Sequence, residues 1–110
     1  MEGAYADMLE IIKNEEELAS CYFADNDLIA VGAMKALKES GYRIPQDIGI
    51  VGFDNLPLGS VVEPALTTIH VPKQYMGEAA AQKLIDLLNT PGQPPTKTEV
   101  STMLVKRGTV

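Results

Sequence analysis

The chain has 110 residues, 45% of them hydrophobic, and a formal net charge of −6. A chain of this length forms one domain or part of one. The negative charge argues against a nucleic-acid-binding surface, because such surfaces are rich in Lys and Arg. No apolar run approaches the roughly 18 residues of a membrane-spanning helix, and the first residues lack the basic and apolar regions of a signal peptide.

The sequence contains one cysteine and one histidine. Cys21 lies in a short apolar stretch, so we expect a small buried side chain rather than a nucleophile, and neither a disulfide framework nor a thiolate metal site. A pair formed by Cys21 and His70 is the one catalytic or metal-binding arrangement that these two residues leave open. We do not favour this pair, and we expect no catalytic residues, no metal site and no cofactor.

Hydrophobic periodicity divides the chain into alternating helices and strands, which predicts an α/β fold with a mostly parallel sheet. Gly41 is placed to end a helix as its C-terminal cap, and Glu15 to Glu17 are expected to form a solvated stretch. The expected elements are a helix at 2–13, a strand at 20–24, a helix at 27–40, a strand at 48–53, a turn or helical fragment at 61–65, a strand at 66–71, a helix at 73–89 and a strand at 98–105.

The stretch 48–55 runs from an apolar strand directly into Asp54 and Asn55. A β-branched apolar run of this kind is typical of a strand buried on both faces of a parallel sheet. Ligands of open α/β sheets bind beyond the carboxyl ends of the strands, so Asp54 lies where a ligand-facing carboxylate is expected. Asp is also a common turn residue, and this stretch alone supports both roles.

A second polar cluster, Asp25-Asn26-Asp27, follows the strand 20–24, and its oxygens can also cap the next helix. If the two strands are neighbours, both clusters face one crevice. A carboxylate accepts hydrogen bonds from two hydroxyls and an amide both donates and accepts, a combination that suits a sugar. Paired carboxylates can also serve a glycosidase or hold a hard cation. We favour the sugar, because neither cluster lies in an aromatic-rich setting and the spacing is not that of a calcium loop.

The helix 27–40 has two apolar surfaces. Ile29, Ala33 and Ala36 share the face that we expect to pack on the sheet, whereas Val31 and Met34 lean outward and leave room for a subunit interface. The basic residues are scattered rather than aligned in a stripe, so we expect them to be solvated on the surface: Arg43, Lys73, Lys106 and Arg107.

Four motifs, in this order and spacing, resemble the lactose/galactose-repressor family. They are FADNDLIAVGAM at 23–34, GYRIPQDI at 41–48, VGFDN at 51–55 and PALTTI at 64–69, and LVKR at 104–107 is similar to the family's terminal strand. The resemblance covers nearly the whole chain. It implies a periplasmic-binding-protein-like, flavodoxin-like lobe with a mostly parallel sheet flanked by helices, from the C-terminal part of the effector domain.

The same resemblance implies how the chain is divided. Residues 1–72 and 98–110 would belong to the C-terminal lobe, and residues 73–97 would be a helix and loop that pack on a first lobe. The family's helix-turn-helix, hinge and first lobe have no counterpart in this sequence. We therefore expect a fragment that holds half of an effector site and binds its effector weakly.

In function, the resemblance implies a cytoplasmic sensor of a small molecule, usually a sugar or nucleobase, whose occupancy changes operator binding by a homodimer. Asn26 and Asp54 match effector-binding positions, and Val31, Met34 and Val62 match segments that contribute to dimerisation. Operator DNA would be bound only through the missing N-terminal domain, with no membrane contact and no catalysis. A solute-binding component of a sugar transporter, or a small flavodoxin-like enzyme or nucleotide-binding domain, are the alternatives.

Overall fold

The computed structural model describes residues 1–14 and 17–110. Two of the three glutamates expected to form a solvated stretch, Glu15 and Glu16, lie outside the described residues, and Glu17 is exposed. The chain divides into two compact units. The first comprises Met1–His70 with Met103–Val110, and the second comprises Val71–Thr102.

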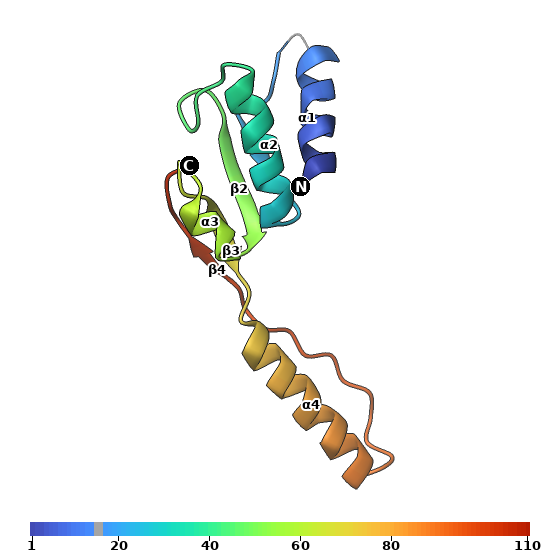
Figure 1. Ribbon diagram of the computed structural model, residues 1–110. Coiled ribbons are helices and arrows are strands. Elements are labelled where there is room, and N and C mark those ends of the chain that lie inside the picture. The colour runs from blue at the N-terminus through green and yellow to red at the C-terminus, as the bar shows by residue number, and fades with distance from the viewer. Residues whose placement is uncertain (15–16) are drawn as a thin grey trace. The chain divides into compact units, whose positions relative to one another are not determined.

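The first unit is an α/β layer built on a mixed sheet. Within the described residues the strand order is β1-β2-β3-β4, in which β1, β2 and β3 are parallel and β4 is antiparallel to β3. The predicted fold class, a mostly parallel sheet with helices, is confirmed. The elements are α1 (Glu2–Asn14), β1 (Cys21–Phe23), α2 (Asp27–Glu39), β2 (Gly49–Asp54), α3 (Leu58–Val61), β3 (Thr67–His70), α4 (Lys73–Asn89) and β4 (Met103–Val105) (Figure 1).

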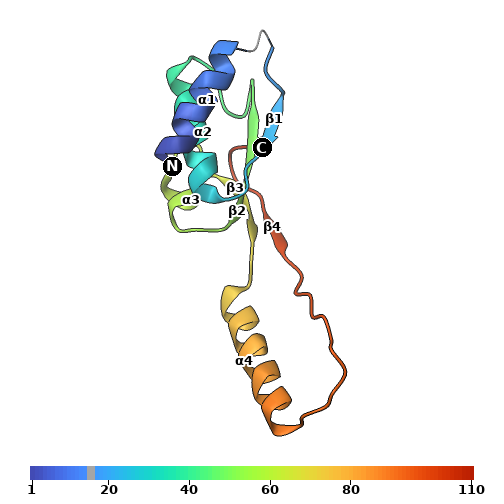
Figure 2. The same ribbon diagram turned by 90° about the vertical axis from the view of Figure 1, so that its right-hand side faces the viewer.

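Helices α1, α2 and α3 lie on the same side of the sheet (Figure 2). Successive residues of a strand point to opposite faces. Along the edge strand β1, Tyr22 packs against the core on the helical side, whereas Cys21 and Phe23 belong to the other face and are exposed. The expectation that Cys21 is buried is therefore wrong, because an apolar sequence alone does not tell which strand lies at the edge of the sheet.

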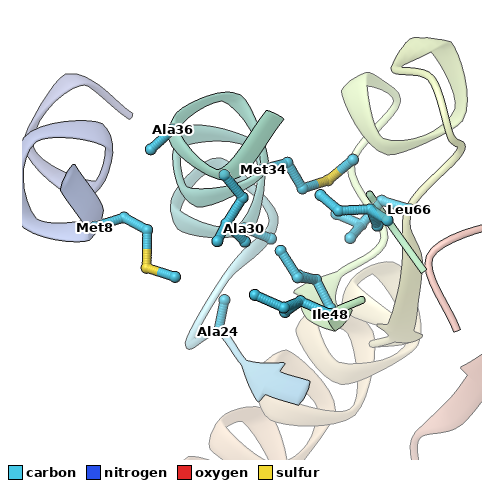
Figure 3. Close-up of a cluster of buried hydrophobic side chains, with 10 residues drawn as sticks. Met8, Ala24, Ala30, Met34, Ala36, Ile48 and Leu66 are labelled. Atoms are coloured by element: carbon cyan, nitrogen blue, oxygen red, sulfur yellow. The ribbon is translucent and has the colours of Figure 1, made fainter. Parts of the chain in front are cut away.

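The core lies between α2 and the sheet, and Met8 reaches it from α1 (Figure 3). The side of α2 that faces the sheet carries Ala30, Met34 and Leu37, and the buried Asp27 lies on this side too. Residues three, seven and ten positions after Asp27 share its side of the helix. The predicted face was Ile29, Ala33 and Ala36, of which only Ala36 is fully buried and Ile29 is 37% exposed. The face that packs on the sheet is therefore rotated about the helix axis relative to the predicted one. The buried hydrophobic residues are Met8, Ala24, Ala30, Met34, Ala36, Leu37, Ile44, Ile48, Ile50 and Leu66.

Two elements differ from their predicted bounds by more than one residue. Helix α3 begins at Leu58, before the expected fragment, because Pro57 has helical backbone angles and accepts a hydrogen bond from the Ser60 amide. Strand β4 spans Met103–Val105 rather than 98–105, because the paired part of β3 extends only from Thr68 to His70.

The connector before β2 contains a bidentate ion pair on the surface. Arg43 donates from Nε to Oδ2 of Asp47 at 2.9 Å and from Nη2 to Oδ1 at 2.7 Å, and its backbone amide donates to Oδ2 at 2.8 Å. These bonds favour the charged carboxylate and lower the pKa of Asp47 to about 2.

We expect the stabilising effect of this pair to disappear in acid. A carboxyl group whose pKa is depressed by folding stabilises the native state above its ordinary titration range, and this contribution is lost as the pH falls through the folded pKa. The melting temperatures of the native chain and of Asp47→Asn should therefore differ near neutral pH and converge as the pH approaches about 2. A difference that stays constant over this range would contradict the assignment.

Candidate ligand-binding site

The two polar clusters lie at one edge of the sheet. Strands β1 and β2 are parallel neighbours, with Phe23 opposite Val51. Asp25-Asn26-Asp27 and Asp54-Asn55 therefore follow the carboxyl ends of adjacent strands, the edge at which open α/β sheets bind ligands. The condition set by the sequence, that these strands be neighbours, is met.

Asn26 is the cap of α2. Its backbone is extended, with φ −156° and ψ 169°, and its Oδ1 accepts a hydrogen bond from the Ile29 amide at 2.9 Å. Of the residues that the sequence offered as caps, Asn26 fills this role. Because capping uses the amide oxygen, the Nδ2 group is the part of the side chain that is suited to donate to a ligand.

Asp54 and Asn55 form a left-handed turn at the end of β2. Their φ angles are 106° and 54°, a region that non-glycine residues seldom adopt and in which Asp and Asn are enriched. Both residues are half-buried. The turn role that the sequence allowed for Asp54 is thus part of the structure, and the turn lies at the carboxyl edge of the sheet, where open α/β folds bind ligands.

Behind this turn lies a buried carboxylate. Asp27 is 0% exposed. Its Oδ1 accepts from the Thr68 hydroxyl at 2.5 Å, and its Oδ2 accepts from the Leu56 amide at 2.6 Å. The sequence offered Asp27 only as a possible cap, because nothing local predicts bonds to residues 29 and 41 positions away.

The side-chain amide of Asn55 contacts two further residues, His70 and Arg107. Its Nδ2 lies 3.1 Å from Nδ1 of His70, and its Oδ1 accepts from Nη2 of Arg107 at 2.7 Å. Arg107 also donates from Nη1 to the Leu66 carbonyl at 2.9 Å and is half-buried. The expectation that Arg107 is solvated on the surface is wrong, because the antiparallel return of β4 brings this residue beside β2 and β3.

The possible Cys21–His70 pair is excluded by the sheet. Cys21 begins β1, opposite Gly49, whereas His70 ends β3, opposite Asp54. Since β1, β2 and β3 are parallel, the two side chains lie at opposite edges. The described part of the chain contains no group of three His, Cys, Asp or Glu residues that is arranged to hold a metal ion.

The residues expected at a dimer interface, Val31, Met34 and Val62, line one surface depression between α2 and the segment that follows α3. Val31 and Val62 are half-buried, but Met34 is only 3% exposed. The expectation that Met34 leans outward is wrong, because Met34 belongs to the core-facing stripe of α2. Lys38 crosses to the Glu63 carbonyl, with a hydrogen bond of 2.6 Å. The other residues that line the depression are Lys35, Lys38, Glu39 and Glu63.

The second unit is a helix followed by an extended segment. The structure describes every residue of α4, and none is buried. Its stripe of Met76, Ala80, Leu84 and Leu87 is exposed, and these residues line a depression together with Thr96, Thr98 and Val100. Among the helices of residues 1–14 and 17–110, none has the length and apolarity needed to cross a membrane.

The sheet thus carries both polar clusters at its carboxyl edge, the place at which open α/β folds bind ligands. The family model of the periplasmic binding protein-like domain matches residues 2–110. The chain belongs to this family.

The chain is 38% identical over 109 residues to the HTH-type transcriptional repressor PurR of Klebsiella pneumoniae, and the match covers 99% of this chain and 32% of that repressor. A LacI family transcriptional regulator from Arthrobacter sp. FB24 in complex with lactose has a TM-score of 0.85 and 34% identity, covering 98% of this chain and 40% of that one.

The lac repressor dimer, bound to operator and the anti-inducer ONPF, has a TM-score of 0.87 and 30% identity, over 96% of this chain and 36% of that one. These similar proteins are transcriptional regulators rather than enzymes, and they confirm the resemblance to the lactose/galactose-repressor family. The chain spans about a third of the length of the curated relatives that it matches.

Proposed function

We propose that this chain is the effector-sensing portion of a bacterial transcriptional regulator, in which binding of a small molecule changes binding to an operator. The observation that carries the proposal is that Asn26 and Asp54 lie at the carboxyl ends of adjacent parallel strands. The match to regulators, one of them in complex with lactose, supports it. On this proposal the protein acts in the cytoplasm and is not an enzyme.

The chemistry of the two side chains favours a sugar as the effector, with a nucleobase as the second class. The Asp54 carboxylate can accept hydrogen bonds from two adjacent hydroxyl groups, and such charge-assisted bonds are among the strongest available to a neutral ligand. Asn26 would donate from Nδ2, because its oxygen caps α2.

This chain would supply one side of the effector site. The C-terminal lobe would be formed by residues 1–72 and 98–110, and residues 73–97 would pack on another lobe. The relatives are long enough to contain such a lobe, because the match covers only 32% of the PurR repressor. The exposed α4, which has no buried residue, supports this division. Lobe closure around the ligand would then couple occupancy to the rest of the regulator, because a ligand stabilises the arrangement with which it makes more contacts.

The regulator would act as a homodimer that contacts operator DNA through parts other than this acidic chain. Val31 and Val62 would supply apolar interface surface in the depression beside α2, with Met34 supporting it from the core. Lys and Glu side chains around the depression would form its polar rim, as in other protein interfaces.

The test is a ligand screen followed by an operator measurement on the complete gene product that carries this sequence. A ligand that binds only the native state raises the melting temperature. We expect lactose, ribose or another small sugar to do so, or adenine or guanine from the second class, and the same compound to change operator affinity. A compound that raises the melting temperature without affecting operator binding would support a solute-binding protein instead.

We also expect the 110-residue chain to self-associate through the apolar stripe of α4, because large exposed apolar patches promote association. Its light-scattering mass should rise with concentration. Leu84→Lys should restore a monomer, whereas Ile85→Lys, an exposed apolar position outside the stripe, should leave the association in place. A monomeric mass at every concentration of the unsubstituted chain would contradict this expectation.

A further inference from the structure

The buried carboxylate of Asp27 joins parts of the chain that are distant in sequence. Asp27 begins α2, Thr68 lies in β3, and Leu56 follows the Asp54-Asn55 turn. One carboxylate oxygen accepts from the Thr68 hydroxyl and the other from the Leu56 amide. Both oxygens are thus engaged by groups on other elements, in a place fully shielded from water.

Gly52 leaves the space for this carboxylate. A Cβ atom at position 52 would overlap Oδ1 of Asp27 and lie 3.0 Å from Cδ2 of Leu66. A side chain at this position of β2 would therefore displace the carboxylate from its place against the strand. The glycine two residues before Asp54 is explained by Asp27 rather than by backbone conformation, because its φ is not positive.

The hydrogen bonds of Asp27 hold the second residue of the left-handed turn and the residue that follows it. The backbone N–H of Leu56, just after the turn, donates to Asp27. The backbone N–H of Asn55 donates at 3.3 Å to the Thr68 hydroxyl, and this hydroxyl in turn donates to Asp27. Consecutive left-handed non-glycine residues are unfavourable and persist only where surrounding contacts hold them. Hydrogen bonds to a buried, charged acceptor are strong enough to do so.

We propose that Asp27 is a positioning residue: by holding the Leu56 amide and the Thr68 hydroxyl, it fixes the turn that presents the Asp54 carboxyl group to the effector. This inference rests on the proposed function, in which Asp54 binds the effector. Because Asp27 is fully buried, it would act on the ligand only through the turn.

The test compares Asp27→Asn with Asp7→Asn, which removes the same charge from an exposed position on α1, outside the candidate site. In the complete gene product, Asp27→Asn should speed hydrogen exchange at the Leu56 amide and weaken binding of the effector, each by roughly tenfold or more, since a hydrogen bond to a charged group is lost. The backbone chemical shifts of Asp54 and Asn55 should change. Asp7→Asn should leave all three measurements unchanged.

A conservative pair at Thr68 provides the second measurement, in case Asp27→Asn does not fold. Thr68→Ser keeps the hydroxyl and should preserve slow exchange at Asn55 and Leu56 and the effector affinity. Thr68→Val keeps the shape but loses the hydroxyl, and should speed exchange and weaken binding as Asp27→Asn does.

The inference is overturned if Asp27→Asn or Thr68→Val folds and keeps native exchange at Leu56. It is also overturned if either variant only lowers the melting temperature and retains native effector affinity. Failure of the proposed function would be distinct: the unsubstituted protein would then bind none of lactose, ribose, adenine or guanine, while the exchange at Leu56 would still respond to Asp27→Asn.

Discussion

Replacing Asp54 by asparagine is expected to weaken effector binding by roughly hundredfold or more, because two hydrogen bonds to a charged acceptor contribute about 1.5–3 kcal/mol each and 1.4 kcal/mol is about tenfold in affinity. Asparagine has the shape of aspartate and also tolerates the left-handed conformation found at this position, where φ is 106°. The substitution therefore removes the charge without forcing a new backbone conformation.

The measurement is calorimetric titration of the complete gene product with the sugar or nucleobase that raises its melting temperature. Asp7→Asn is the matched control, because it removes an exposed carboxylate on α1, outside the candidate site. It should bind as the unsubstituted protein does. An Asp54→Asn variant that folds and binds its effector normally would show that Asp54 serves only the turn, and an unfolded variant would show that it is indispensable to the fold.

The second large effect is expected in the core. Leu37→Ala should lower the free energy of unfolding by about 2–5 kcal/mol, because the substitution removes a fully buried side chain and leaves a cavity. Domains of this size are typically stable by only about 5–15 kcal/mol, so the loss would be a large fraction of the total.

Urea unfolding of Leu37→Ala and Leu88→Ala measures this effect against a matched control. Leu88 is 72% exposed on α4, so its truncation should change stability by less than about 0.5 kcal/mol. Equal losses in the two variants would contradict the placement of the core between α2 and the sheet.

The candidate site was largely predictable because its first signal is local. An apolar run that ends in Asp54 and Asn55 predicts a core strand followed by a polar turn, and Asp25-Asn26-Asp27 ends the preceding strand in the same way. The carboxyl ends of parallel strands share one edge, so pairing β1 with β2 was sufficient to bring the clusters together.

The residues behind the site were not predictable, because their contacts span the whole chain. Arg107 reaches Asn55 only because β4 returns antiparallel beside β3, and Asp27 meets Thr68 only because β3 lies next to β2. Neither arrangement leaves a periodic pattern in the sequence.

The orientation of α2 was missed for a related reason. Its apolar residues surround much of the helix, so periodicity alone supports several faces. The buried Asp27 fixes the rotation of α2 about its own axis. This rotation places Met34 inward and leaves Ile29 partly exposed. A charged residue is an improbable guide to a core face unless its hydrogen-bond partners are known.

Nuclear magnetic resonance mapping of the bound effector tests the central claim most directly. The isotopically labelled complete gene product would be titrated with lactose, or with whichever sugar or nucleobase raises its melting temperature. The account predicts that the largest shift changes in this part of the protein occur at the amides of Asn26, Asp54, Asn55 and Leu56. Changes confined to the opposite edge of the sheet, around Cys21 and Gly49, would contradict it.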